Sequence, residues 1–149
     1  MVLADEKVLL AVFVLQDSLR NVANDLVSGL QKSGVHTLLY SGDDETAVST
    51  IARKLGIGTY QSAMLPDDKL QKLKSLQDTG AVVAMVGDGI NDAPVLAGAD
   101  VSIAMGEGAQ YAAAAADMVL FRSNLDILGN GIRTAGKMMR VIRQNLTWA

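Results

Sequence analysis

The sequence contains no cysteine and only one histidine, His36. These absences exclude disulfides, a cysteine nucleophile and thiolate metal sites, and they exclude a zinc site with two histidines from one chain. Aromatic residues make up 4% of the chain and the formal net charge is −3. Because nucleic-acid surfaces are typically basic and often stack bases on aromatic rings, we predict no nucleic-acid partner.

Long apolar runs are also absent. No stretch reaches the ~20 residues that a membrane-spanning helix needs. Charged residues at 5–7 interrupt the apolar start of the chain, which is not the pattern of a signal peptide. The 149 residues are 50% hydrophobic, enough to bury the core of one domain. We therefore expect the chain by itself to be soluble, or to be a soluble piece of something larger.

Charge is distributed unevenly along the chain. All 16 acidic residues and nine of the 13 basic ones lie within residues 1–126. The charged residues of the segment 127–149 are all basic, namely Arg133, Lys137, Arg140 and Arg143. Two interpretations stay open for this segment: an ordinary solvated helix face, or a basic segment beside a membrane.

Short apolar segments alternate with segments of helical periodicity. Strands are expected at 7–15, 36–40, 59–63, 81–86, 101–105 and 118–121, and helices before Gly34, Gly56 and Gly80, at 109–116 and at about 125–148. The alternation predicts an open, Rossmann-like α/β fold, with a parallel sheet covered by helices on both faces. The continuous apolar run at 81–86 predicts a strand buried on both faces.

Ligands of such folds bind beyond the carboxyl ends of the strands, so residues 41–43 and 87–89 are expected to face one crevice. Asp88 and Asp92 are carboxylates that can hold Mg²⁺, or they make only a turn and a helix cap. Gly87 and Gly89 allow close approach to a phosphate, and Asn91 can orient the carboxylates.

A second group of polar residues can likewise be interpreted as binding a ligand or as serving only the local structure. Ser41 and Gly42 offer a hydroxyl and an N–H for a phosphate, or they form a plain helix cap. Lys69 lies near a helix start, where a lysine opposes the helix dipole. It either neutralises a phosphate or forms a salt bridge with a nearby aspartate. His36 has no evident partner, and we interpret it as structural.

One eight-residue motif, GDGINDAP at 87–94, carries a family resemblance. Four further segments occur in the same order as in that family: DSLR at 17–20, SGD at 41–43, LPDDK at 65–69 and VAMV at 83–86. With these segments the chain resembles, over essentially its whole length, the phosphorylation domain of P-type ATPases in the haloacid-dehalogenase-like superfamily. The SGD segment and the tail IRQNLTWA at 142–149 are most similar to the heavy-metal-transporting branch.

The resemblance implies phosphoryl transfer from ATP to an aspartate, with Mg²⁺ as cofactor. It implies metal ligation by Asp88 and Asp92, and phosphate stabilisation by Ser41, Gly42 and Lys69. The other residues that it places at the cofactor or nucleotide are Asp17, Arg20, Asp43, Gly87, Gly89 and Asn91.

The family's nucleophile motif, Asp-Lys-Thr-Gly-Thr, occurs nowhere in the sequence. We therefore expect residues 1–126 to be a partial phosphorylation domain without its central nucleophile strand. Residues 127–149 are expected to form a basic helix leading towards a membrane helix of a parent protein, on its cytoplasmic face. The expected partners are the missing half, with its nucleotide-binding and actuator domains, and the membrane.

The missing strand would lie between the strands at 36–40 and 81–86. We expect the segment 7–15, or self-association, to fill its place. Two alternative functions stay open: a stand-alone phosphatase of the same superfamily, and a non-catalytic interaction module.

Overall fold

The computed structural model describes residues 2–4, 9–12, 21–88, 92–105, 116–120 and 125–148. The strands are β1 (Val2–Ala4), β2 (Leu9–Val12), β3 (Leu38–Tyr40), β4 (Thr59–Gln61), β5 (Ala84–Gly87), β6 (Val101–Met105) and β7 (Met118–Leu120). The helices are α1 (Asn21–Lys32), α2 (Glu45–Leu55), α3 (Pro66–Asp78), α4 (Ala93–Gly98) and α6 (Leu125–Trp148). The helix expected at 109–116 lies outside the described residues, except for Ala116.

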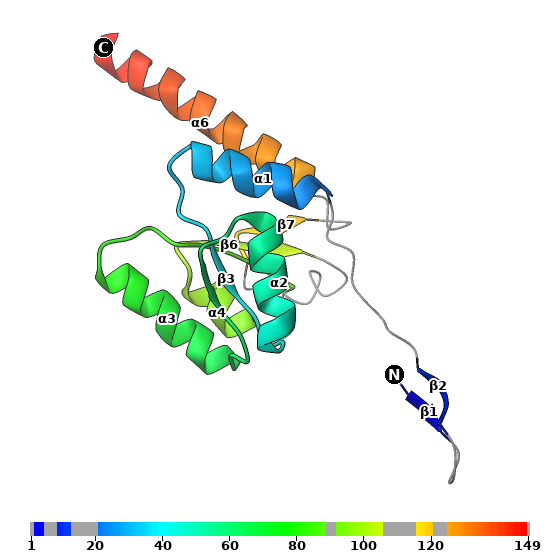
Figure 1. Cartoon of the computed structure of the whole chain (residues 1–149). Coiled ribbons are helices and arrows are strands. Elements are labelled where there is room, and N and C mark those ends of the chain that lie inside the picture. Colours follow the sequence, from blue (N-terminus) through cyan, green and yellow to red (C-terminus); the bar gives the residue numbers. More distant parts are fainter. Residues whose placement is uncertain are drawn as a thin grey trace.

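From α1 to β6 helices and strands alternate, as the sequence predicts. β3 and β4 form one parallel pair, while β5, β6 and β7 form a parallel sheet in that order. Parallel neighbours need a crossover connection, and α2 supplies it between β3 and β4. The predicted α/β fold with parallel strands is therefore confirmed (Figure 1).

Helices cover both faces of the three-stranded sheet. Neighbouring residues of β6 point to opposite faces, as in any strand. Ala104 is fully buried with Leu96 of α4 on one face. Ile103 is buried on the other face with Leu128 of α6, and Leu26 of α1 packs against them. The core is thus divided by β6 into two layers.

The break between the two parallel sheets lies where the family resemblance expects the missing strand. Within the described part of the chain, β3 pairs only with β4, and β5 pairs only with β6. The segment 7–15 does not bridge this break where it is described, because β2 pairs with β1 in an antiparallel hairpin. A partner only a few residues away in sequence costs less loop-closure entropy than a distant sheet edge.

The expectation that the strand at 81–86 is buried on both faces is wrong. The strand occupies Ala84–Gly87, Val86 is 39% exposed, and the preceding Val82 is 83% exposed. The physical reason is its position: β5 is the edge of its sheet, so only β6 flanks it.

The long C-terminal helix, α6, extends beyond α1, which packs along its first half (Figure 1). The two helices approach closely at Gly129, where an added Cβ would lie 3.4 Å from Cδ1 of Leu26. Among the described helices, none combines the length and the apolar character needed to cross a bilayer.

Candidate phosphate and magnesium site

The loop that follows β3 is folded on itself. The Ser41 N–H continues the β-ladder by donating to the Gln61 carbonyl at 3.0 Å. The Ser41 hydroxyl donates to Oδ2 of Asp43 at 2.8 Å, and the Asp43 N–H donates back to Oγ of Ser41 at 3.2 Å. Residue 44 then caps α2, because the Asp44 carboxylate accepts from the Ala47 N–H. Ser41 and Asp43 therefore hold the loop, and the cap itself comes from Asp44.

A second loop, after β4, is hydrogen-bonded to the loop that follows β3. The Ala63 N–H donates to the Asp43 carbonyl at 2.8 Å, and the Met64 N–H donates to the Ser41 carbonyl at 3.0 Å. The Ser62 hydroxyl donates to the carboxylate of Glu45 in α2. Ala63 has a φ of 50°, a left-handed conformation that is costly for a residue with a Cβ. This turn ends the strand, which the sequence predicts to run to residue 63.

The second loop leads directly into α3 and so positions Lys69. Pro66 occupies the first turn, and the Leu65 N–H donates to Oδ2 of Asp68 at 3.0 Å. Nζ of Lys69 lies 2.7 Å from Oδ1 of Asp92, in an ion pair whose side chains are each 12% exposed. Lys69 therefore forms an ion pair, but its partner is an aspartate 23 positions away along the chain and not one of its neighbours in sequence.

Asp92 faces Lys69, although it stands at the N-terminus of α4. Its carbonyl accepts from the Leu96 N–H at 2.8 Å, but its side chain makes no capping hydrogen bond. The interpretation of this carboxylate as a mere helix cap is therefore wrong. An added Cβ at Gly87 would lie 3.2 Å from Oδ2 of Asp92, so the glycine makes room for this carboxylate.

Asp88 is exposed at the carboxyl end of β5, directly after Gly87. The structure thus brings Gly87, Asp92 and Lys69 together, and it fixes the loop at 41–43 to the segment that carries Lys69. Four predicted site residues lie outside the described residues: Asp17, Arg20, Gly89 and Asn91. In the described part of the chain, no three carboxylate or histidine side chains gather as a metal site.

Sequence reasoning missed the residues that hold the site's strands in place. Oδ2 of Asp100 accepts from the Val83 N–H at 2.8 Å, just before β5. Oδ2 of Asp117 accepts from both the N–H and the hydroxyl of Ser102, each at 2.8 Å, and so fastens the start of β7 to β6. In the sequence, each of these residues is a single aspartate next to an expected strand. Such an aspartate cannot be distinguished from an ordinary turn residue before the fold is known.

These hydrogen bonds have a consequence for acid stability. The hydrogen bond from the Val83 N–H lowers the pKa of Asp100, and those from the Ser102 N–H and hydroxyl lower the pKa of Asp117. A carboxylate with a lowered pKa in the folded state stabilises the fold fully above its ordinary pKa of 3.8. That stabilisation is lost as the pH falls through the folded-state pKa.

We expect Asp117→Asn to lower the urea midpoint at neutral pH and to make the midpoint less sensitive to pH below about 4. The measurement is a series of urea titrations across that range, with the exposed residue Asp78 replaced by Asn as the control. Identical pH profiles for the two variants would contradict the role of Asp117.

Comparison with known proteins agrees with this architecture. A family model described as haloacid dehalogenase-like hydrolase matches residues 2–100. The cation-transporting P-type ATPase B of Mycobacterium leprae is 43% identical over 89% of this chain and 18% of its own length. The copper-exporting P-type ATPase of the same organism is 41% identical over 93% of this chain and 18% of its own length.

A solved structure is similar over nearly the same range. The crystal structure of a zinc-transporting PIB-type ATPase in the E2.Pi state superposes with a TM-score of 0.80 at 39% identity, covering 89% of this chain and 22% of that one. The open α/β fold with polar loops beyond its strand ends is thus that of a haloacid dehalogenase-like hydrolase domain. The chain belongs to the haloacid dehalogenase-like hydrolase family, and it matches a segment of heavy-metal P-type ATPases that spans about a fifth of their length.

Proposed function

We propose that the chain supplies the half of a phosphorylation domain that binds Mg²⁺ and stabilises the phosphoryl group in a heavy-metal P-type ATPase. The part-buried ion pair of Lys69 with Asp92, beside Gly87, carries this proposal. It places a cation and a carboxylate from different elements at the carboxyl end of β5, where ligands of α/β folds bind. The stand-alone phosphatase and the interaction module are not favoured, because the relatives are transport ATPases.

The chemical types of the side chains at this site suit Mg²⁺. Mg²⁺ prefers one or two carboxylates together with waters and substrate phosphates, and Asp88 and Asp92 are two carboxylates at one strand end. Asp88 is exposed and open to a ligand, whereas Oδ1 of Asp92 already faces Lys69. Asn91 would support these two carboxylates. When bound, the ion would neutralise charge that develops on the transferred phosphoryl group.

The chain's own residues would stabilise the phosphoryl group electrostatically. Lys69 offers a point charge, and Ser41 and Gly42 offer a hydroxyl and a backbone N–H. Gly87 and Gly89 would let the backbone approach, while Asp17, Arg20 and Asp43 would lie towards the nucleotide. The hydrogen bonds from Ala63 and Met64 to the 41–43 loop hold the donors of Ser41 and Gly42 in fixed positions before a ligand binds.

The partners in this proposal are the parts of the ATPase that the matched segment does not contain. A strand bearing Asp-Lys-Thr-Gly-Thr would pair with β3 and β5, which belong to separate sheets and each pair on one side only within the described residues. The nucleotide-binding and actuator domains would supply ATP and govern turnover, on the cytoplasmic face of the membrane. Relatives named for copper and for cations in general match almost equally well, so we place ion selectivity outside this segment.

This proposal predicts a clear difference between the chain alone and a chimera. The chain alone is expected to form no hydroxylamine-sensitive phosphoenzyme from labelled ATP, because no activated aspartate is supplied. Fusing it behind the preceding catalytic segment of the zinc-transporting relative should restore the phosphoenzyme. A labelled aspartate in the chain alone would contradict the proposal. A folded chimera that never becomes labelled would contradict it as well.

A further inference from the structure

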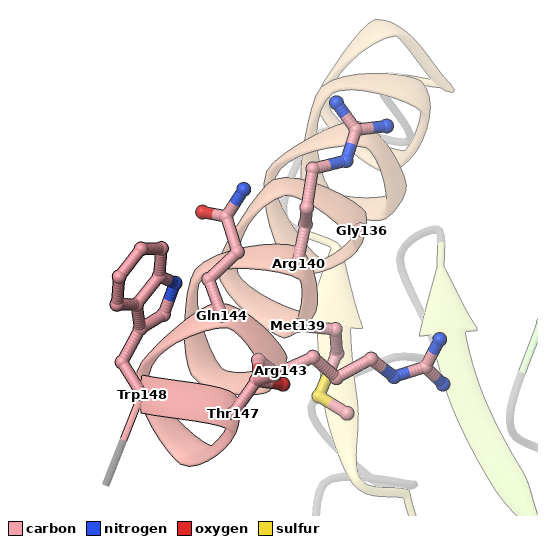
Figure 2. Close-up of a pocket in the computed structure, with 7 residues that line it drawn as sticks. All are labelled: Gly136, Met139, Arg140, Arg143, Gln144, Thr147 and Trp148. Atoms are coloured by element: carbon pink, nitrogen blue, oxygen red, sulfur yellow. The ribbon is translucent and has the colours of Figure 1, made fainter.

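A hollow of about 360 Å³ lies at the amino ends of β3 and β4, whereas Ser41 and the candidate site follow the carboxyl end of β3. Its polar lining comes from the end of α1, the segment before β3 and the start of β4, namely Gln31, His36, Thr37 and Thr59. Another hollow, on α6, is lined by that helix alone and lies open along its surface (Figure 2). The hollow at β3 and β4 therefore differs in depending on the tertiary fold.

Gln31 ties the walls of this hollow together. Its Nε2 donates to Oγ1 of Thr37 at 2.9 Å and to the carbonyl of Gly56, the residue that ends α2, at 3.0 Å. Because Oγ1 of Thr37 accepts this hydrogen bond, its own hydroxyl proton can be donated to a ligand. The Thr59 hydroxyl and the His36 ring make no hydrogen bond to any residue that the structure describes. The hollow thus offers two hydroxyls and an imidazole to an occupant.

The charges around the hollow are positive. The last turn of α1 carries Lys32, and the last turn of α2 carries Arg53 and Lys54. No acidic residue occurs in the segments 26–42 and 46–66, which contain the whole lining. Within the described part of the chain, none of the three basic side chains forms an ion pair. The two helix ends contribute roughly −0.5 charge each, so the basic side chains leave a surplus of about two positive charges.

We propose that this hollow binds a phosphate group, with the hydroxyls of Thr37 and Thr59 donating to its oxygens. An esterified phosphate carries about −1.5 to −2 charge at neutral pH and three acceptor oxygens, which matches the local surplus of charge and the donors. A carboxylate has two oxygens and a single negative charge, so it leaves part of the surplus uncompensated. Pockets for small molecules typically begin at about 300 Å³, so the hollow has room for a small molecule that carries the phosphate.

The proposal does not depend on the proposed ATPase role, because it uses no residue from the carboxyl ends of the strands. The single histidine also makes its test specific to this hollow. Since His36 is the only histidine, the imidazole signals in the proton NMR spectrum report on this hollow alone.

The full chain is titrated with glycerol phosphate, with inorganic phosphate, and with sodium chloride at the same ionic strength, all at constant pH. We expect both phosphates to shift the His36 signals in a saturable way and chloride to leave them in place. Tighter binding of glycerol phosphate assigns the hollow to a phosphomonoester, and otherwise free phosphate is its ligand. Absence of a saturable shift, or an equal shift with chloride, would overturn the proposal.

A matched pair of threonine variants tests the hydroxyl donors. Thr59→Val removes an exposed hydroxyl with little change of side-chain shape. It should weaken phosphate binding roughly tenfold, as expected for the loss of one hydrogen bond to a charged group. Thr46→Val makes the same change at an exposed position in α2 and should bind as the parent chain does. Equal binding by the two variants would contradict the proposal.

A second pair of variants tests the charge. Lys32→Gln with Lys54→Gln should weaken binding, whereas Lys72→Gln with Lys74→Gln makes the same change of charge in α3 and should not. All four lysines are exposed, so the fold is retained, which circular dichroism checks. Lysine variants of α1 and α2 that bind as tightly as those of α3 would show that the basic helix ends play no part.

Ser41→Ala locates the bound phosphate. Ser41 lies at the opposite end of β3, so its hydroxyl should not affect the response of His36. A folded Ser41→Ala chain whose His36 signals no longer respond to phosphate would place the anion at the carboxyl end of β3 and overturn the proposal. An unchanged response, together with its loss in Thr59→Val, assigns the phosphate to the hollow.

Discussion

Replacing Lys69 by methionine is expected to destabilise the chain by about 2 kcal/mol, less than the cost of removing one partner from a fully buried ion pair. The Lys69 and Asp92 side chains are each only 12% exposed, so water compensates little for the lost cation. Methionine preserves the length and apolar stem of lysine, which isolates the charge. The urea midpoint should fall while the slope of the transition stays unchanged.

Two companion variants make the expected result specific. Lys72→Met lies in the same helix at an exposed position and should shift the midpoint little. Adding Asp92→Asn to Lys69→Met should recover part of the loss, because no unpaired charge is then buried. Asparagine has the shape of aspartate, so it fits beside Gly87. Equal effects of Lys69→Met and Lys72→Met would show that the pair does not support the fold.

Local signals in the sequence predicted the order of the elements. Gly56 ends α2 with a φ of 66°, and Gly34 and Gly80 likewise follow α1 and α3 with positive φ. Pro66 begins α3 as expected. These features depend on a few neighbouring residues, because caps and glycine conformations are settled within one turn of chain.

Pairing between distant segments was not predictable in the same way. An apolar run such as 81–86 looks the same in a central strand and at an edge, and only the sheet order reveals Val86 as exposed. Lys69 was predicted to neutralise a phosphate or to pair with a nearby aspartate, and it pairs with Asp92 because α3 and α4 pack together. The residue types of the candidate site were thus predictable from the sequence, whereas the contacts between those residues could be known only from the fold.

Asp88 provides the complementary test, because it should affect chemistry and leave stability unchanged. Its side chain is exposed at the end of β5, so Asp88→Asn removes no buried contact. In the chimera with the zinc-transporting relative, the same substitution is expected to lower phosphoenzyme formation by about 100-fold or more. Loss of one group that stabilises developing charge typically has an effect of this size.

The control for this experiment is Asp78→Asn, an equal change of charge at an exposed position at the end of α3. Both variants should unfold at the same urea concentration as the parent chimera, while only Asp88→Asn loses the labelled aspartate. A stable Asp88→Asn chimera that is labelled as well as the Asp78→Asn control would show that Asp88 does not hold Mg²⁺. Lys69→Met in the same chimera lowers both stability and labelling, because Lys69 supports the fold through Asp92 and offers its charge to the phosphoryl group. Asp88 and Lys69 are therefore distinguished by stability: substitution of Asp88 affects labelling alone, whereas substitution of Lys69 affects both labelling and the fold.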